Sequence, residues 1–167
     1  MSTNITEILS IPKVLYNSNL EEVNSEIVNK SNILGFYFAN NSPVAFGFTK
    51  MLKECYIKWI DSTSNINNVN FQLIYVPLEK NNEEFKESLK TINFLAIPKL
   101  DNEETIKYLT KKYNISNQNL PSLIIVNKYG DIIDNKGVEC INDHFDLAMN
   151  KWAIVASKDY KKLIKEN

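Results

Sequence analysis

One stretch of the chain constrains the fold more than any other: the run ILGFYFA, Ile33 to Ala39, followed by Asn-Asn-Ser-Pro. A run of apolar and aromatic residues without a charge is typical of a strand buried on both faces of a central sheet. Ser42 directly before Pro43 is a strong helix start, because the hydroxyl can accept a backbone N–H and proline has no N–H to leave unpaired. We therefore expect a central strand that leads into a helix from Pro43 to about Ile60.

This helix should have one buried face. At 100° per residue, an apolar stripe about 100° wide is formed by Val44, Phe48, Met51, Leu52, Cys55 and Trp59. We expect the stripe to face the core. Phe46 lies about 200° from Val44 and is expected to point away from it.

The other elements follow from apolar runs and turn signals. After a polar loop from Asp61 to Asn70, we expect a strand at Phe71 to Pro77, helices at Glu83 to Leu89 and at Asn102 to Tyr113, a hairpin of Ser122 to Asn127 with Asp131 to Asp134, and a last helix over residues 143–165. Residues 1–30 are expected to form an N-terminal extension with a short strand or helix. This order predicts an α/β fold, a central mixed β-sheet with helices on both faces.

Composition sets the class of protein. With 167 residues and 44% hydrophobic content, residues 1–167 are expected to form a single domain. All nineteen basic side chains are Lys, and the net charge is -1, which argues against nucleic-acid binding. No apolar run approaches the roughly 20 residues that span a bilayer, and the start of the chain does not resemble a signal peptide. We therefore expect a cytoplasmic protein without a membrane or nucleic-acid partner.

Three strings then resemble a known family. GFYFANNSPVAFGFTK, Gly35 to Lys50, is similar to GLYFSASWCPPCRGFTP of the tryparedoxin and nucleoredoxin branch of the thioredoxin-like superfamily. INFLAIPK, Ile92 to Lys99, and LPSLIIVNKYGDII, Leu120 to Ile133, match two further strings of that branch in order and approximate spacing. The resemblance implies a thioredoxin-like fold. It also implies that Pro121 is the cis-proline that presents the neighbouring backbone of Leu120 to a substrate.

The chain departs from the family at the active-site motif. Aligned on GFT, the two motif cysteines fall on Ser42 and Ala45, the intervening prolines on Pro43 and Val44, and the preceding Trp on Asn41. Thiol–disulfide exchange needs one thiolate to attack and a second thiol to resolve the mixed disulfide. We therefore expect no catalytic residue at this degenerate CxxC motif.

Two other cysteines leave a redox alternative open. Cys55 lies thirteen residues beyond Ser42, about 20 Å along a helix, and is expected to be a core residue. Cys140 lies in a polar segment and is expected to be more exposed. The alternative is a thioredoxin-family thiol-disulfide oxidoreductase or a redox sensor that uses Cys140 or Cys55.

Other chemistry has less support in the sequence. Ser42 is not in a G-x-S-x-G elbow, and the one histidine, His144, is distant in sequence and is expected in the first turn of the last helix. One His and two separated Cys do not make a metal site, so we expect neither a metal nor a cofactor.

The leading prediction is a redox-inactive, nucleoredoxin-like domain that binds a protein or peptide. Its predicted partner-binding residues are Asn41, Ser42, Pro43, Val44, Phe46, Leu120 and Pro121. An exposed aromatic such as Phe46 beside a peptide groove is a plausible anchor, and strand addition at Pro121 is the expected mode. A structural subunit of a complex is a third possibility, and the sequence leaves the partner and the oligomeric state open.

Overall fold

The computed structural model describes residues 4–61 and 69–166, and of residues 159–166 only the path of the helix. In chain order the elements are α1 (Ile5–Ile8), β1 (Val14–Tyr16), β2 (Glu22–Asn24), the 3₁₀ helix η1 (Ser25–Lys30), β3 (Ile33–Ala39), α2 (Pro43–Ile60), β4 (Phe71–Pro77), α3 (Asn82–Leu89), β5 (Leu95–Ala96), α4 (Glu103–Lys112), η2 (Asn117–Asn119), β6 (Ser122–Asn127), β7 (Ile132–Asp134), α5 (Gly137–His144), η3 (Phe145–Leu147) and α6 (Ala148–Glu166).

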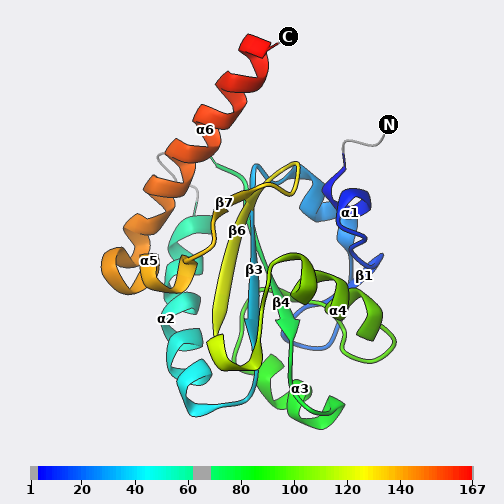
Figure 1. Ribbon diagram of the computed structural model, residues 1–167. Helices are drawn as coiled ribbons and strands as arrows, with labels where there is room; N and C mark the ends of the chain where they lie inside the picture. The colour runs from blue at the N-terminus through cyan, green and yellow to red at the C-terminus, as the bar shows by residue number, and fades with distance from the viewer. Residues whose placement is uncertain (1–3, 62–68, 167) are drawn as a thin grey trace.

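The strands form one mixed sheet with β3 near its centre (Figure 1). In the described part of the chain the strand order is β2-β1-β5-β4-β3-β6-β7. Strand β3 runs parallel to β4 and antiparallel to β6, and β4 runs parallel to β5. Every residue of β3 is buried, as its uninterrupted apolar sequence predicted.

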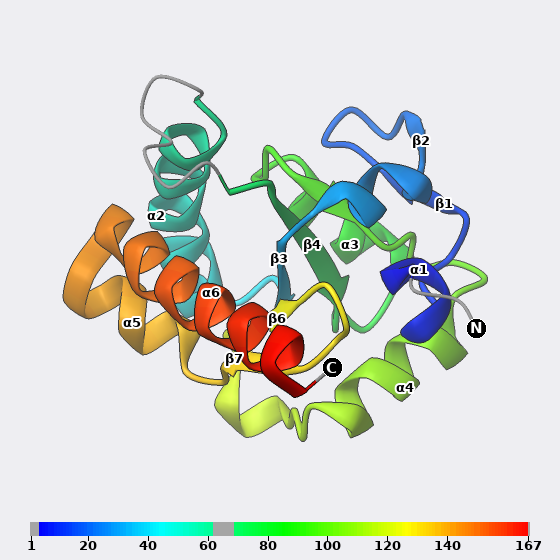
Figure 2. The ribbon, with the colours of Figure 1, turned by 90° about the horizontal axis from the view of Figure 1, so that it is seen from above.

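Helices cover both faces of the sheet. Figure 2 shows α2, α5 and α6 on one side and α1 and α4 on the other. Side chains of α2, α3, α5 and α6 share one buried cluster, and those of α1, η1 and α4 share a second. The expected α/β architecture is thereby confirmed. Among the described residues, no helix is both long and apolar enough to cross a bilayer.

Helix α2 begins as the sequence predicted. Ser42 Oγ accepts the backbone N–H of Ala45 at 3.2 Å, and Pro43 occupies the first turn. The buried face differs in one respect: Phe48, Leu52, Cys55 and Trp59 are buried, but Val44 is 70% exposed. The prediction that Val44 faces the core is wrong, because the face that packs on the sheet begins at Ala45, one residue further along the helix.

The C-terminal region also differs from the prediction of one helix over residues 143–165. Two helices are present, α5 and α6, separated by η3. Phe145 has a φ of 53°, in the left-handed region that interrupts a right-handed helix. His144 therefore ends α5 rather than beginning the last helix, and Cys140 lies within α5.

The N-terminal extension contains both a helix and strands. Strand β1 pairs with β2 and with β5, so the segment extends the sheet. Ile5, Leu9, Leu15 and Val28 are almost completely buried on the face covered by α4. Of the loop expected between Asp61 and Asn70, residues 62–68 lie outside the described residues.

Candidate functional site

The candidate site lies at the end of the sheet where β3 and β4 finish and β6 begins. Ala39 pairs with Pro77 and Phe38 with Ser122, so the loop into α2 and the Leu120–Pro121 segment come from neighbouring strands at the same end. We call residues 40–46 and 119–122 the Ser42 pole. The Leu120–Pro121 peptide bond is cis, which confirms the isomer that the resemblance implied.

Ser42 has a structural role at this pole. Its hydroxyl oxygen accepts the N–H of Ala45, its carbonyl accepts the N–H of Phe46 at 3.0 Å, and its own N–H donates to Asn40 Oδ1 at 3.1 Å. Such a cap satisfies a backbone donor that the first turn of a helix leaves unpaired. His144, which a hydrolase would need as a base, lies at the end of α5 with Nε2 2.8 Å from Lys151 Nζ.

Ala45, the second motif position, faces the interior and is fully buried. Its carbonyl accepts from Thr49 Oγ1 at 2.7 Å and from the Tyr37 hydroxyl at 3.2 Å. The Tyr37 and Thr49 oxygens are 2.8 Å apart. Burial raises the pKa of Tyr37 well above its usual value, so the phenol stays neutral and can donate. The sequence analysis missed this hydroxyl pair, since tyrosine within an apolar run gives no polar signal.

A carboxyl group is buried near the same pole. Glu79 follows β4 and is only 3% exposed. The Tyr75 hydroxyl bonds to its Oε1, while Oε2 has no hydrogen-bond partner among the described atoms. Burial raises the pKa of Glu79, which favours the neutral acid. The sequence analysis missed Glu79 as well, because it stands in the polar string LEKNNEE, which is typical of a surface loop.

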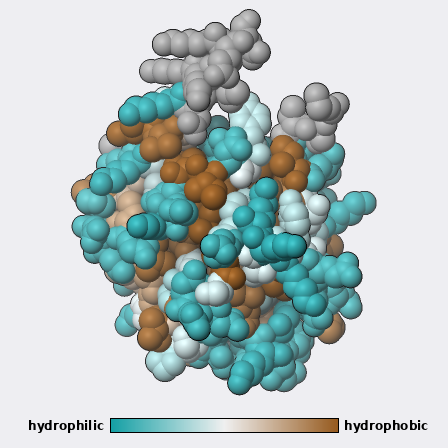
Figure 3. Space-filling view, viewed as in Figure 1, coloured by the Kyte–Doolittle hydropathy of each residue, from teal (hydrophilic) through white to brown (hydrophobic). Residues whose placement is uncertain are grey.

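The outer surface of the pole is partly apolar. Val44 is 70% exposed and Phe46 is 37% exposed, so the expectation that Phe46 points away from the core is confirmed. Asn41 and Pro43 are exposed, whereas Leu120 and Pro121 are half-buried. On the face seen in Figure 3, apolar surface forms separate patches among hydrophilic side chains.

Neither cysteine lies at the pole. Cys55 and Cys140 are free thiols. Cys55 is fully buried mid-way along α2, and burial raises its pKa from 9.0 to about 12. Cys140 is partly buried on α5, where burial and the carboxylate of Asp134 raise its pKa. Both thiols are therefore held in the protonated form, which is the weaker nucleophile. Within the described residues, no group of three His, Cys, Asp or Glu side chains is placed to hold a metal ion.

Comparison with known proteins gives one family. Residues 29–132 match the family model described as thioredoxin-like. Probable nucleoredoxin 3 from Oryza sativa subsp. japonica is 31% identical over 116 residues, which are 69% of this chain and 23% of the relative. Nucleoredoxin from Homo sapiens is 28% identical over 130 residues, 77% of this chain and 28% of the relative. The chain thus spans less than a third of the length of these two nucleoredoxins.

Solved structures give the same fold. Tryparedoxin from Trypanosoma brucei superimposes with a TM-score of 0.73 at 23% identity, covering 91% of this chain and 99% of that one. Native tryparedoxin I from Crithidia fasciculata superimposes with a TM-score of 0.71 at 22% identity, covering 87% of this chain and 94% of that one. At this level of identity the likeness shows the fold.

Proposed function

This chain belongs to the thioredoxin-like family, and we propose that it is a redox-inactive member that binds a protein or peptide segment at the Ser42 pole. The observation that carries the proposal is the identity of the two motif positions. Ser42 and Ala45 hold no sulfur, and each has a structural role in the first turn of α2. A dithiol cycle needs two thiols at this place, one to attack and one to resolve.

The positions of the two cysteines support a redox-inactive protein. Cys55 lies about 20 Å along α2 from Ser42, at 1.5 Å per residue. Its thiol is buried and its pKa is raised. Cys140 lies within α5, outside residues 40–46 and 119–122. Neither thiol therefore occupies a position of the degenerate motif.

The exposed surface of the pole supports binding. Val44 and Phe46 present apolar surface beside the N-terminal end of β6. In strand addition, an extended peptide gains affinity from main-chain hydrogen bonds and specificity from pockets or anchors for its side chains. Leu120 and Pro121 would supply the main chain, and Val44 and Phe46 would supply the apolar contacts.

Reduction of insulin by dithiothreitol tests the redox part of the proposal. We expect the wild-type protein to leave the uncatalysed rate unchanged. A double variant, Ser42→Cys with Ala45→Cys, restores the motif thiols on the same scaffold and is expected to accelerate the reaction. Acceleration by the wild type would contradict the proposal and would assign chemistry to Cys55 or Cys140. The single variants Cys55→Ala and Cys140→Ala would then identify the thiol.

Binding is tested with peptides selected from a random phage-displayed library on the folded protein. We expect the selected peptides to shift the amide NMR signals of residues 40–46 and 119–122. Val44→Asp should abolish binding, because it places a charge on the proposed contact surface. Ile154→Asp is the matched control: Ile154 is also exposed, at 56%, but lies on α6. Equal loss in both variants, or shifts elsewhere, would overturn the proposed site.

A further inference from the structure

A depression lies at the opposite end of the sheet from the Ser42 pole. It is lined by the end of η1 with Ser31, by the end of α2, and by the start of β4 with the two residues before it, and its volume is about 300 Å³. In the β3–β4 register, Ile33 pairs with Phe71 at this end and Ala39 with Pro77 at the other. Six residues at about 3.3 Å each separate the two ends by about 20 Å. A ligand here would not touch the Ser42 pole.

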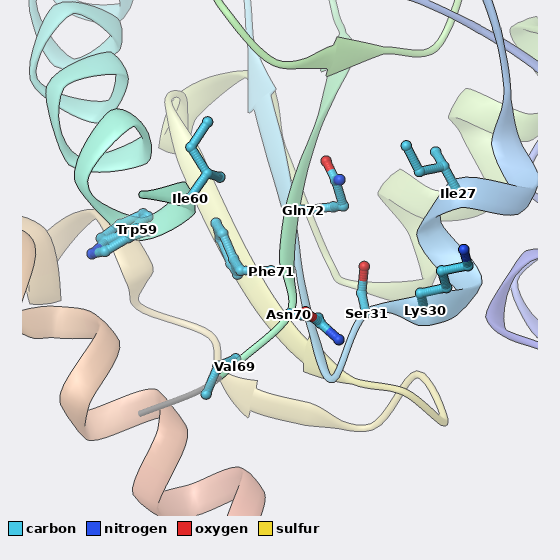
Figure 4. A pocket seen from close by; sticks show the side chains of 9 residues that line it. All are labelled: Ile27, Lys30, Ser31, Trp59, Ile60, Val69, Asn70, Phe71 and Gln72. Atoms are coloured by element: carbon cyan, nitrogen blue, oxygen red, sulfur yellow. The ribbon is translucent and has the colours of Figure 1, made fainter. Parts of the chain in front are cut away.

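One wall of this depression is apolar, and one further apolar side chain stands on the opposite wall. Trp59 and Phe71 form its inner part, each 6% exposed, with ring centroids 5.2 Å apart. Ile60, at the end of α2, and Ile27, on η1, stand at the rim and are 53% and 46% exposed. Figure 4 shows Trp59, Ile60 and Phe71 on the α2 side and Ile27 across from them. Two exposed branched side chains that border one hollow leave apolar surface for a ligand to cover.

The other wall carries polar side chains that can donate. Figure 4 shows Lys30, Ser31 and Gln72 on the side of η1 and β4. Gln72 Oε1 accepts from the Tyr56 hydroxyl at 3.1 Å, which leaves its amide N–H groups as donors. Lys30 makes no ion pair with any described residue. None of the described residues that line the hollow carries a carboxylate. This wall therefore suits a ligand group that accepts hydrogen bonds and carries negative charge.

We propose that this hollow is a binding site for a small carboxylate with an aromatic or branched aliphatic tail. The tail packs on Trp59, Phe71 and the two isoleucines, and the carboxylate faces Lys30, Ser31 and Gln72. The volume is at the lower end of the range for small-molecule sites, which limits the ligand to about the size of a single substituted ring. The site is independent of partner binding at the Ser42 pole.

Phenylacetate and its neutral isostere phenylacetamide test the assignment by amide NMR titration of the isotope-labelled protein. We expect phenylacetate to give saturable shifts in residues 27–31, 59–60 and 69–72, and phenylacetamide to bind more weakly. Lys30→Gln should lower the affinity for phenylacetate about twofold to fivefold, the range for a solvent-exposed charge pair. The affinity for phenylacetamide should stay unchanged. Unchanged phenylacetate affinity in this variant would overturn the role of Lys30.

Two further variants keep the test specific. Ile27→Asp places a carboxylate at the rim and should abolish phenylacetate binding, with thermal unfolding used to verify that the fold is retained. Leu100→Asp is the control, since Leu100 is 65% exposed and follows β5 at the other end of the sheet. Absence of saturation in the wild type, shifts at residues 40–46, or equal loss in both variants would overturn the proposal.

Discussion

The two faces of the sheet are built from different chemistry. The face under α1, η1 and α4 buries Ile, Leu, Val and Phe together with one tyrosine, Tyr113. The face under α2, α3, α5 and α6 buries three tyrosines, both tryptophans and Cys55, and next to them Thr49 and Glu79. Strand β3 contributes side chains to both faces. Leu34, Phe36 and Phe38 lie on the face under α1, η1 and α4, and Tyr37 lies on the face under α2, α3, α5 and α6.

The two faces differ in how many buried polar groups they hold. The first face, which we call the aliphatic face, packs mainly through dispersion and the hydrophobic effect, and its one buried tyrosine hydroxyl, on Tyr113, donates to the Gly130 carbonyl at 3.3 Å. On the second, the polar face, hydroxyls bond to one another and to the Ala45 carbonyl beneath the first turn of α2. Buried polar groups specify geometry through their hydrogen bonds and are costly when a partner is lost. The polar face thus holds the first turn of α2 in place, whereas Leu120 of the Ser42 pole packs against the aliphatic face.

Truncation on the aliphatic face should have the largest effect. Phe36 is fully buried and its ring stacks on Tyr113 at 5.8 Å between centroids. Phe36→Ala removes most of a ring and leaves a cavity, so we expect the free energy of unfolding to fall by about 3–5 kcal/mol. Urea unfolding followed by circular dichroism measures it. A loss below about 1 kcal/mol would mean that this face is not close-packed.

Loss of the helix cap should lower the free energy of unfolding less than Phe36→Ala does. Ser42→Ala removes the oxygen that accepts the Ala45 N–H, and we expect a loss of about 1 kcal/mol. Ser42→Asp retains an acceptor at the cap and is the matched control, expected to stay near wild-type stability. Equal destabilisation by both variants would show that the hydroxyl does not act as a cap.

Removal of one hydroxyl on the polar face should lower the free energy of unfolding by about as much as loss of the Ser42 cap. Tyr37→Phe deletes the bonds to Ala45 and Thr49, while Thr49 keeps its own bond to the Ala45 carbonyl. We expect a loss of about 0.5–1.5 kcal/mol. Phe38→Leu, a fully buried change on the aliphatic face of the same strand, is the comparison. A Tyr37→Phe variant as stable as the wild type would remove the distinction between the two faces.

Substitution of Glu79 should change how the free energy of unfolding depends on pH. Burial raises the pKa of Glu79 in the folded protein above its usual value. A group of this kind stabilises the fold fully below its unfolded pKa, and that contribution is lost as pH rises through the folded pKa. We therefore expect Glu79→Gln to flatten the decline in stability above about pH 4.5.

Urea midpoints across this pH range measure the effect of Glu79→Gln. Glu87→Gln is the control, because Glu87 is exposed and pairs only with Lys90 at 3.3 Å. If the two variants follow the same pH curve, Glu79 is not the neutral acid that its burial implies.

The central elements could be predicted from sequence because each has a local signal. The bounds of β3 follow from an uninterrupted apolar run and those of β4 and β6 from mainly apolar runs, and Pro43 fixes the start of α2. At the candidate site the cap by Ser42 and the cis bond before Pro121 were expected and are present. Partner binding stays a prediction for all seven residues: Asn41, Ser42, Pro43, Val44, Phe46, Leu120 and Pro121.

The remaining features depend on tertiary contacts. The break at Phe145 requires a positive φ at an aromatic residue, for which the sequence has no marker. Val44 lies at the edge of the sequence-predicted stripe, and the face that α2 buries is turned toward Ala45 and Tyr56. Glu79 is buried because α3 and Tyr75 pack around it, although its neighbours in sequence are polar. Gly137 packs so closely that a Cβ would lie 2.6 Å from the Leu123 carbonyl oxygen.

The central position of β3 has a consequence for how the molecule opens. Its backbone is bonded to β4 on one side and to β6 on the other, and all seven residues are buried. Its amide hydrogens donate alternately to β4 and to β6, so all of them can exchange with solvent only when both neighbours separate from it, which amounts to global unfolding. Strands β2 and β7 at the edges can open alone. Amide exchange should therefore be slowest in the strand that leads to Ser42, so the candidate site begins on the part of the protein that opens least.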